Sequence, residues 1–186
     1  MRYAYKKKVL DLGCLGSLLG ILENCRNDIL ARRKVAYNSI IWLHGILAKF
    51  SSYCVGVDIN KRGIELMRKH GYTCYIADIE KPFDLKMKFD IAIASKVIYY
   101  LSGLKTFMDN VKRHLKPHGA LVIAVENPFF LKRVLEAVKG PEIKYISGSL
   151  ALYDLRRLIN LVERFNLKPI ECYYSYFLLK PKKSCI

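Results

Sequence analysis

The residues of this chain that could do chemistry come directly after short apolar runs. Two glycines, Gly13 and Gly16, follow the run at 9–12, and a carboxylate, Asp58, follows the run at 54–57. Glycine lets the backbone pass close to a ligand and adopt conformations that other residues avoid. A carboxylate at the end of a second strand can accept hydrogen bonds from both hydroxyls of a ribose. This pattern predicts a ligand of the nucleotide type.

Two more polar positions repeat the arrangement. Asp78 follows an apolar run at 73–77, and Ser95 and Lys96 close the run at 89–95. In an open parallel sheet, ligands bind outside the carboxyl ends of the strands, at the point where the strand order reverses. If these runs are parallel strands, all of these side chains converge on one edge of the sheet.

Hydrophobic periodicity predicts the elements that would position these residues. The run at 89–95 is almost continuously apolar, which is typical of a strand buried on both faces of a parallel sheet. Apolar residues recur at helical spacing in 104–115 and 154–165. Alternating strands and helices indicate βαβ crossovers. We therefore expect an α/β fold, namely a Rossmann-like, doubly wound, mostly parallel seven-stranded sheet with helices on both faces. The expected strands are 9–12, 54–59, 73–77, 89–95, 120–125 and one or two within 168–179, and the expected helices are 17–30, 61–70, 104–115 and 154–165.

Five segments, in order, resemble the motifs of class I S-adenosylmethionine (SAM) dependent methyltransferases. They are Val9-Leu-Asp-Leu-Gly-Cys14, Val55-Gly-Val-Asp58, Ala77-Asp-Ile79, Phe89-Asp-Ile-Ala-Ile-Ala-Ser95 with the following Val97-Ile-Tyr-Tyr-Leu101, and Leu115-Lys-Pro-His-Gly119 before a strand. The resemblance covers nearly the whole chain and is closest to the ubiquinone-biosynthesis-like, type 11 and type 12 group. It implies SAM as the cofactor. The cofactor contacts that it implies are Asp11, Gly13, Cys14, Leu15, Gly16, Asp58, Ile59, Ala77, Asp78, Ile79, Ser95 and Lys96.

The roles implied by the resemblance differ among these residues. Asp58 would meet the ribose and Asp78 the adenine amino group, with the Ile79 backbone N–H beside it. Asp11 would order the glycine loop. From the residues alone, Asp58 could instead be an acid favoured at a helix N-terminus, and Asp78 a turn aspartate.

The chain departs from the family's pattern in the glycine loop. Leu15 stands where relatives have a second glycine, and Ser17 at a position that is often glycine. Gly16 and Asp58 are 42 residues apart, against about 20 in dinucleotide-binding motifs. The excess predicts an insertion at about 24–52.

The predicted acceptor side also departs from the family. Lys96 replaces an acidic residue of many relatives, and Tyr99-Tyr100 replaces a Glu-His pair. We expect Tyr99, Tyr100 and Asn127 on the acceptor side, the last in a substrate-facing loop at about 126–150. Both tyrosines could equally belong to the core.

Trp42 and His44 complete the acceptor-side candidates. Relatives with this Trp-Leu-His segment have it folded over the cofactor or substrate, although simple packing is the alternative. The other histidines, at 70, 114 and 118, are interpreted as helix-end or turn residues. No catalytic residue is assigned, because the methyl group of SAM is already activated and positioning supplies much of the rate.

Composition bounds the remaining choices. The 186 residues fit one domain, 1–186, and no apolar run is long enough to cross a bilayer. Six scattered cysteines without a C-x-x-C pair favour a reducing cytoplasm and argue against a metal site. Lys and Arg outnumber Asp and Glu by 32 to 16, a net charge of +16. Nucleic acid is therefore a candidate partner, against a merely solvated basic surface. A homodimer is also considered.

Three classes of function remain open. The leading one is an enzyme that transfers a methyl group from SAM to a small-molecule or carrier-linked acceptor, with RNA methylation as a variant favoured by the charge. The second is a catalytically degenerate SAM-fold protein that binds or scaffolds a partner. The third is a nicotinamide dehydrogenase, which the long gap before Asp58 and the incomplete G-x-G-x-x-G pattern disfavour.

Overall fold

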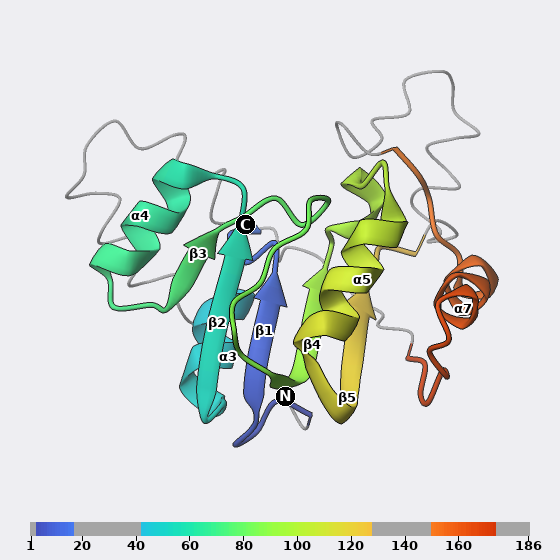
Figure 1. The fold of residues 1–186 in the computed structure, drawn as a ribbon, viewed down its shortest axis with the longest axis horizontal. Coiled ribbons are helices and arrows are strands. Elements are labelled where there is room, and N and C mark those ends of the chain that lie inside the picture. The colour runs from blue at the N-terminus through green and yellow to red at the C-terminus, as the bar shows by residue number, and fades with distance from the viewer. Residues whose placement is uncertain (1–2, 17–41, 128–149, 174–186) are drawn as a thin grey trace, which may run out of the picture. The chain divides into compact units, whose positions relative to one another are not determined.

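The protein is described from a computed structural model, which covers residues 3–16, 42–127 and 150–173. Strands and helices are interspersed along the described residues (Figure 1). The strands are β1 (Lys8–Leu12), β2 (Tyr53–Asp58), β3 (Cys74–Ile76), β4 (Phe89–Ser95) and β5 (Leu115–Ala124). The helices are α3 (Leu43–Phe50), α4 (Lys61–Lys69), the short 3-10 helix η1 (Ile98–Tyr100), α5 (Leu104–His114) and α7 (Leu155–Arg164).

The five strands form one parallel sheet in the order β3-β2-β1-β4-β5. The chain runs outward from β1 through β2 to β3, then crosses to the other side of β1 and continues through β4 to β5. The strand order therefore reverses between β1 and β4, where an open α/β sheet has its ligand crevice. Gly13 follows β1 and Lys96 follows β4 at this switch point.

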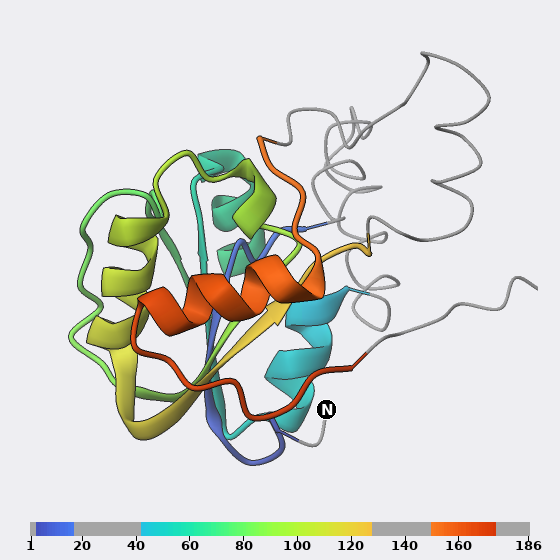
Figure 2. The same ribbon diagram turned by 90° about the vertical axis from the view of Figure 1, so that its right-hand side faces the viewer.

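Helices cover both faces of the sheet. In Figures 1 and 2, α3 lies on one face and α5 on the other. α4 packs on the same face as α3, because Trp42 before α3 and Ile64 of α4 belong to one buried cluster. Alternating residues of β1 meet these two layers: Asp11 contacts His44 of α3, and Leu10 and Leu12 point the opposite way.

Local sequence explains where the helices begin and end. The Asn60 side chain accepts a hydrogen bond from the Gly63 N–H at 2.8 Å, which caps the start of α4. Gly71, with φ +84, follows the end of that helix. The N-terminus of α5 is capped from a distance. Oε1 of Glu80 accepts the N–H groups of Ser102 and Gly103 and the Ser102 hydroxyl, at 2.7–2.8 Å.

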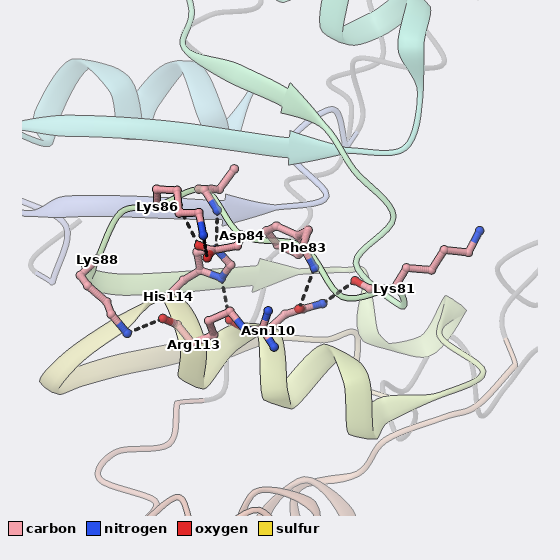
Figure 3. A network of polar contacts seen from close by, with 9 residues as sticks. Lys81, Phe83, Asp84, Lys86, Lys88, Asn110, Arg113 and His114 are labelled. Carbon is pink, nitrogen blue, oxygen red and sulfur yellow. Dashed lines mark hydrogen bonds and ion pairs between the residues drawn. The ribbon is translucent and has the colours of Figure 1, made fainter.

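Hydrogen bonds also hold the segment between β3 and β4 against the rest of α5 (Figure 3). The Phe83 N–H donates to the Asn110 side chain, and the Asn110 amide donates to the Lys81 carbonyl. Nε2 of His114 accepts the Leu85 N–H at 3.0 Å, and Nδ1 donates to the Asn110 carbonyl at 2.7 Å. These bonds fix the neutral form of His114, and burial lowers its pKa.

The predicted α/β fold is confirmed. β4 has the predicted bounds, and β1, β2, β3 and the helices at 61–70, 104–115 and 154–165 begin and end within one residue of the prediction. β5 begins five residues early, because pairing with β4 starts at Leu115 before an interruption where His118 adopts φ +61. Of the seven predicted strands, five are found in the described residues. Residues 168–173 form no strand, and 174–179 and the predicted helix 17–30 lie outside the described residues.

The chain divides into two compact units, 1–153 and 154–186. The first contains the sheet with its helices, and the second contains α7. In the described part, no helix is long and apolar enough to span a membrane. The single domain and the insertion at about 24–52 stay predictions; within that insertion, 43–50 forms α3 against β2.

Candidate functional site

The glycine loop after β1 is held by the end of β2. The N–H groups of Gly13 and Cys14 donate to the Val57 carbonyl at 2.8 and 3.2 Å. Gly13 and Gly16 have φ +77 and +45, the left-handed region that glycine adopts without strain. A Cβ on Gly13 would lie 2.9 Å from the Val97 side chain. Glycine at 13 is therefore required both by the turn and by the close approach of the chain after β4.

Leu15 fits the loop because of another glycine. Its side chain is fully buried, and a Cβ on Gly63 of α4 would lie 2.4 Å from its nearest methyl group. The bulk that replaces the usual loop glycine is thus accommodated inside the protein, at the expense of a side chain in α4. Leu15 contributes its backbone to the sheet edge, while its side chain fills the core.

Asp58 joins the loop to the end of β2. Its Oδ2 accepts the Leu15 N–H at 3.2 Å, and its Oδ1 accepts the Asn60 N–H at 3.0 Å. The residue is 8 % exposed, whereas its neighbour Ile59 is 68 % exposed. An ordered carboxylate beside an uncovered apolar side chain can offer hydrogen bonds to a polar ligand group and packing surface to a flat one.

Asp78 follows β3, next to the end of β2 that carries Asp58 and Ile59. The Ala77 N–H donates to the Asp58 backbone carbonyl at 3.1 Å, so the ends of β2 and β3 are held together. Oδ1 of Asp78 accepts the Glu80 N–H at 3.0 Å, and Oδ2 is 3.4 Å from Nζ of Lys81. Ile79 is buried, and its carbonyl accepts a hydrogen bond from Asn110 of α5.

Lys96 is held in place at the other side of the switch point. It has φ +56, and its N–H donates to the Ala124 carbonyl at 2.8 Å. Its ammonium lies 3.3 Å from the carboxylate of Glu126, which follows β5. This ion pair was not foreseen from the sequence, because neither residue alone indicates the other. It places a carboxylate near the position where many relatives have an acid in place of Lys96.

Trp42 and His44 are buried against the glycine loop. Nε1 of Trp42 donates to the Cys14 carbonyl at 2.7 Å, and Nδ1 of His44 lies 2.9 Å from Oδ2 of Asp11. Trp42, His44 and Tyr72 form a three-ring cluster with centroids 5.1–5.7 Å apart. Nε2 of His44 is buried and has no hydrogen-bond partner among the residues that the structure describes.

This arrangement bears on Asp11 as well. Its carboxylate pairs with His44, while the N–H groups of Gly13, Cys14 and Leu15 bond to Val57 and Asp58. Any ordering of the loop by Asp11 therefore passes through the 42–44 segment. Gly56 makes room for this packing, since a Cβ there would lie 2.7 Å from Sγ of Cys14. Burial raises the pKa of Cys14, so this thiol stays protonated.

The remaining acceptor-side candidates follow β4 and β5. Tyr99 is buried, and its carbonyl accepts the N–H groups of Leu150 and Ala151 at 2.7 and 3.3 Å. Tyr100 is 41 % exposed, with its ring 4.6 Å from that of Tyr99. Asn127 is partly buried just past β5. Within the described ranges, no three His, Cys, Asp or Glu side chains are grouped closely enough to hold a metal ion.

The chain is similar to known proteins in sequence and in fold. Residues 42–123 match the family described as a methyltransferase domain. Among solved structures, the N-methyltransferase NodS from Bradyrhizobium japonicum WM9 has a TM-score of 0.50 and 20 % identity, over 86 % of this chain and 72 % of that one. A SAM-dependent methyltransferase described as a possible histamine N-methyltransferase, from Thermotoga maritima, has a TM-score of 0.54 and 18 % identity, over 85 % and 62 %.

A SAM-dependent methyltransferase from Mesorhizobium loti matches at a TM-score of 0.46 and 20 % identity, over 70 % of this chain. The chain spans about half the length of that protein, 52 %. No curated protein matches the sequence.

Residues 42–123 thus match the methyltransferase-domain family, and the chain has the fold of the class I SAM-dependent methyltransferases. The resemblance noted in the sequence is confirmed, and SAM is the cofactor of this class. The glycine loop with Asp11 lies before the matched residues.

Proposed function

We propose that this protein is a SAM-dependent methyltransferase that acts on a small-molecule or carrier-linked acceptor. One observation carries the proposal. The glycine loop, Asp58 and Asp78 meet at the carboxyl edge of the sheet beside the switch point, and direct hydrogen bonds connect the loop to Asp58 and β3 to β2. An edge built in this way fits a nucleoside with a polar tail.

The described residues fit the cofactor in their chemistry. The backbone from Gly13 to Gly16 would bind the methionine part, because glycine permits a close approach there. The carboxylate of Asp58 would accept the ribose hydroxyls, and the exposed side chain of Ile59 would pack on the adenine. Asp78 and Ile79 would meet the adenine edge. Their neighbours Cys14, Leu15, Ala77, Ser95 and Lys96 would complete the contacts.

The acceptor would enter from the side of β4 and β5. SAM supplies a methyl group on a positively charged sulfur, so a lone ammonium nearby would oppose its binding. Glu126 neutralises Lys96 at 3.3 Å and offsets this repulsion. Tyr99 and Tyr100 follow Lys96 in sequence, and Asn127 follows Glu126. Trp42 and His44 pack against the glycine loop. One structural neighbour is an N-methyltransferase and another is described as a possible histamine N-methyltransferase, so a nitrogen acceptor is the first class to test.

Calorimetric titration with S-adenosylhomocysteine tests the proposal. We expect wild-type protein to bind it, and Ile59→Ser to bind at least about tenfold more weakly with unchanged thermal stability, because Ile59 is exposed and lost packing area costs affinity. Ile170→Ser, at a residue 81 % exposed in the second unit, is the matched control. Absence of wild-type binding would overturn the proposal and favour a degenerate scaffold protein, and binding of NAD alone would favour a dehydrogenase.

A reducing, cytoplasmic location also belongs to this proposal. The four described cysteines, Cys14, Cys54, Cys74 and Cys172, are free. Burial raises the pKa of Cys14, Cys54 and Cys74, which suits inert structural thiols. Mass spectrometry after alkylation of unreduced, denatured protein isolated from its source should find these four cysteines alkylated, because denaturation exposes the buried thiols. Disulfide-linked peptides would contradict the assignment.

A further inference from the structure

A mixed surface of lysines and aromatic rings lies at the amino end of the sheet. It is formed by Tyr5, Lys6, Lys7, Lys49, Phe50 and Tyr53, all exposed, and we call it the lysine–tyrosine surface. The amino ends of β1 and β2 are at the bottom of Figure 1, opposite the ends that carry Gly13 and Asp58. This surface therefore belongs to no part of the proposed methyl-transfer site.

Two chain segments far apart in sequence build the surface together. The Lys6 N–H donates to the Phe50 carbonyl at 2.9 Å, and the Ser52 N–H donates to the Lys7 carbonyl at 3.0 Å. Lys8 and Tyr53 are paired in the parallel register of β1 and β2. The surface is thus fixed by backbone hydrogen bonds and strand pairing.

The charges of this surface are available to a partner. Segments 3–8 and 49–53 contain no acidic residue. Within the described residues, no carboxylate lies within 4 Å of the ammonium of Lys6, Lys7 or Lys49, whereas lysines elsewhere such as Lys81 and Lys86 are paired. Asp90 is nearby, but its oxygens accept the Lys8 N–H at 2.8 Å and the Lys116 ammonium at 2.7 Å.

The aromatic rings of this surface are exposed and lie next to its ammonium groups. Tyr5, Phe50 and Tyr53 are 57 %, 42 % and 39 % exposed. Nζ of Lys6 lies 5.4 Å from the centroid of Tyr5, and Nζ of Lys49 lies 5.9 Å from that of Phe50. All the large apolar side chains exposed in segments 3–8 and 49–53 are aromatic. Surfaces that enter the membrane interface typically present Trp, Phe and Leu, whereas these segments expose mainly tyrosine.

We propose that the lysine–tyrosine surface binds single-stranded nucleic acid. Ammonium groups neutralise phosphates, and aromatic rings stack on unpaired bases in a way that tolerates any sequence. A duplex hides the faces of its bases, so the rings give a preference for single strands. This inference is independent of the proposed methyl transfer, because it concerns the opposite end of the sheet and its test requires no SAM.

Fluorescence anisotropy with a 12-nucleotide mixed-sequence RNA, labelled with fluorescein, tests the charges. Affinity falls with salt, and in the triple variant Lys6→Gln/Lys7→Gln/Lys49→Gln the slope of log affinity against log salt should become less steep by about two. A control triple variant removes the same charge from exposed residues of α4 and α5, Arg62→Gln/Lys69→Gln/Lys105→Gln, and should keep the wild-type slope. Equal reductions of the salt slope in the two triple variants would overturn the proposal, since total charge alone would then explain binding.

Ring replacement tests stacking and separates nucleic acid from membrane. Tyr5→Leu and Phe50→Leu, made singly, should each weaken binding of the RNA about tenfold. Both variants should unfold thermally near the wild-type temperature, because both side chains are exposed. The matched RNA duplex should bind more weakly than the single strand. No binding of the single strand, equal binding of the duplex, or tighter binding of the leucine variants to vesicles containing 30 % phosphatidylserine would each overturn the proposal.

Discussion

The two buried histidines of the described chain, His114 and His44, lie on opposite faces of the sheet and differ in how their ring nitrogens are used. Both nitrogens of His114 bond to backbone groups, and its ring stacks on Phe83 at 4.7 Å. His44 bonds through Nδ1 to the Asp11 carboxylate, while its buried Nε2 has no partner among the described residues. The sequence predicts different places for the two residues, His44 in the Trp-Leu-His segment and His114 at a helix end, but it does not reveal how their ring nitrogens are used.

The difference distinguishes a structural histidine from one with a ring nitrogen that bonds to no described residue. Nε2 of His114 holds the segment at 83–88 to α5 through the Leu85 N–H, and Nδ1 bonds to the Asn110 carbonyl within α5. His44 bonds to the Asp11 carboxylate of β1 next to the glycine loop, and its other ring nitrogen has no hydrogen-bond partner in the described part of the chain. A buried polar atom without a partner costs free energy unless something compensates for it. The face of α3 is therefore where we expect changes to affect ligand binding as well as stability.

The largest expected effect comes from breaking the Asp11–His44 pair. His44→Leu leaves a buried carboxylate without its partner and should lower the free energy of unfolding by about 3–5 kcal/mol. Urea unfolding measures this loss. Asp11→Leu/His44→Leu should lose less than His44→Leu alone, because it leaves no unpaired charge. A single-variant loss below about 1 kcal/mol would show that the pair is not a stabilising contact.

His114→Leu should have a smaller effect, confined to stability. It leaves the Leu85 N–H and the Asn110 carbonyl without their partners, which should cost about 2 kcal/mol in urea unfolding. The affinity for S-adenosylhomocysteine should stay at the wild-type value, since this helix end lies away from the glycine loop. A variant that loses affinity while remaining folded would erase the contrast between the two histidines.

Removing the charge of Glu80 should weaken the same helix at its other end. The carboxylate accepts three hydrogen bonds at the start of α5, which also lower its pKa. Glu80→Gln should reduce stability by about 1 kcal/mol. Glu65→Gln is the matched control, because Glu65 is exposed and its contact with Lys61 is 4.0 Å long. Equal thermal unfolding temperatures for the two variants would argue against the cap.

The smallest effect should appear in the dependence of stability on pH. Burial lowers the pKa of His114, so the unfolded chain takes up a proton that the folded chain resists. The contribution of His114 is fully present above about pH 6.5 and is lost as pH falls from there toward the lowered pKa, by up to about 1.4 kcal/mol per pH unit. Urea unfolding between pH 7.5 and 5.5 should show a steeper decline for wild type than for His114→Leu. Parallel declines would contradict this.

Much of the fold could be predicted because strands in a parallel sheet are near-continuous apolar runs. The segment at 89–95 shows this best, and its predicted bounds equal those of β4. The bounds of β5 were harder, because Pro117 and His118 read as a turn although pairing with β4 already begins at Leu115. Apolar patterns locate a strand core better than its ends.

The site was less predictable, because its key contacts join residues far apart in sequence. Asp58 and Asp78 could be placed at one edge, since strand ends in a parallel sheet meet there. The pairing of His44 with Asp11 depends on how α3 packs on β1, which no local pattern encodes. His114 was expected at a helix end and does end α5, but its position in the sequence does not reveal which groups its ring contacts. Glu80 gave no signal at all, because a glutamate in a polar loop is normally solvated.

The contact between Leu15 and Gly63 makes the residue allowed at one position depend on the other. A larger side chain in α4 would collide with the leucine, whereas a smaller residue in the loop would leave a void that a larger residue in the helix could fill. Mutational change at this pair therefore has a preferred order, in which the loop residue shrinks before the helix residue grows. A lineage that began with glycine in the loop must have taken the same path in reverse, with the helix acquiring its glycine first.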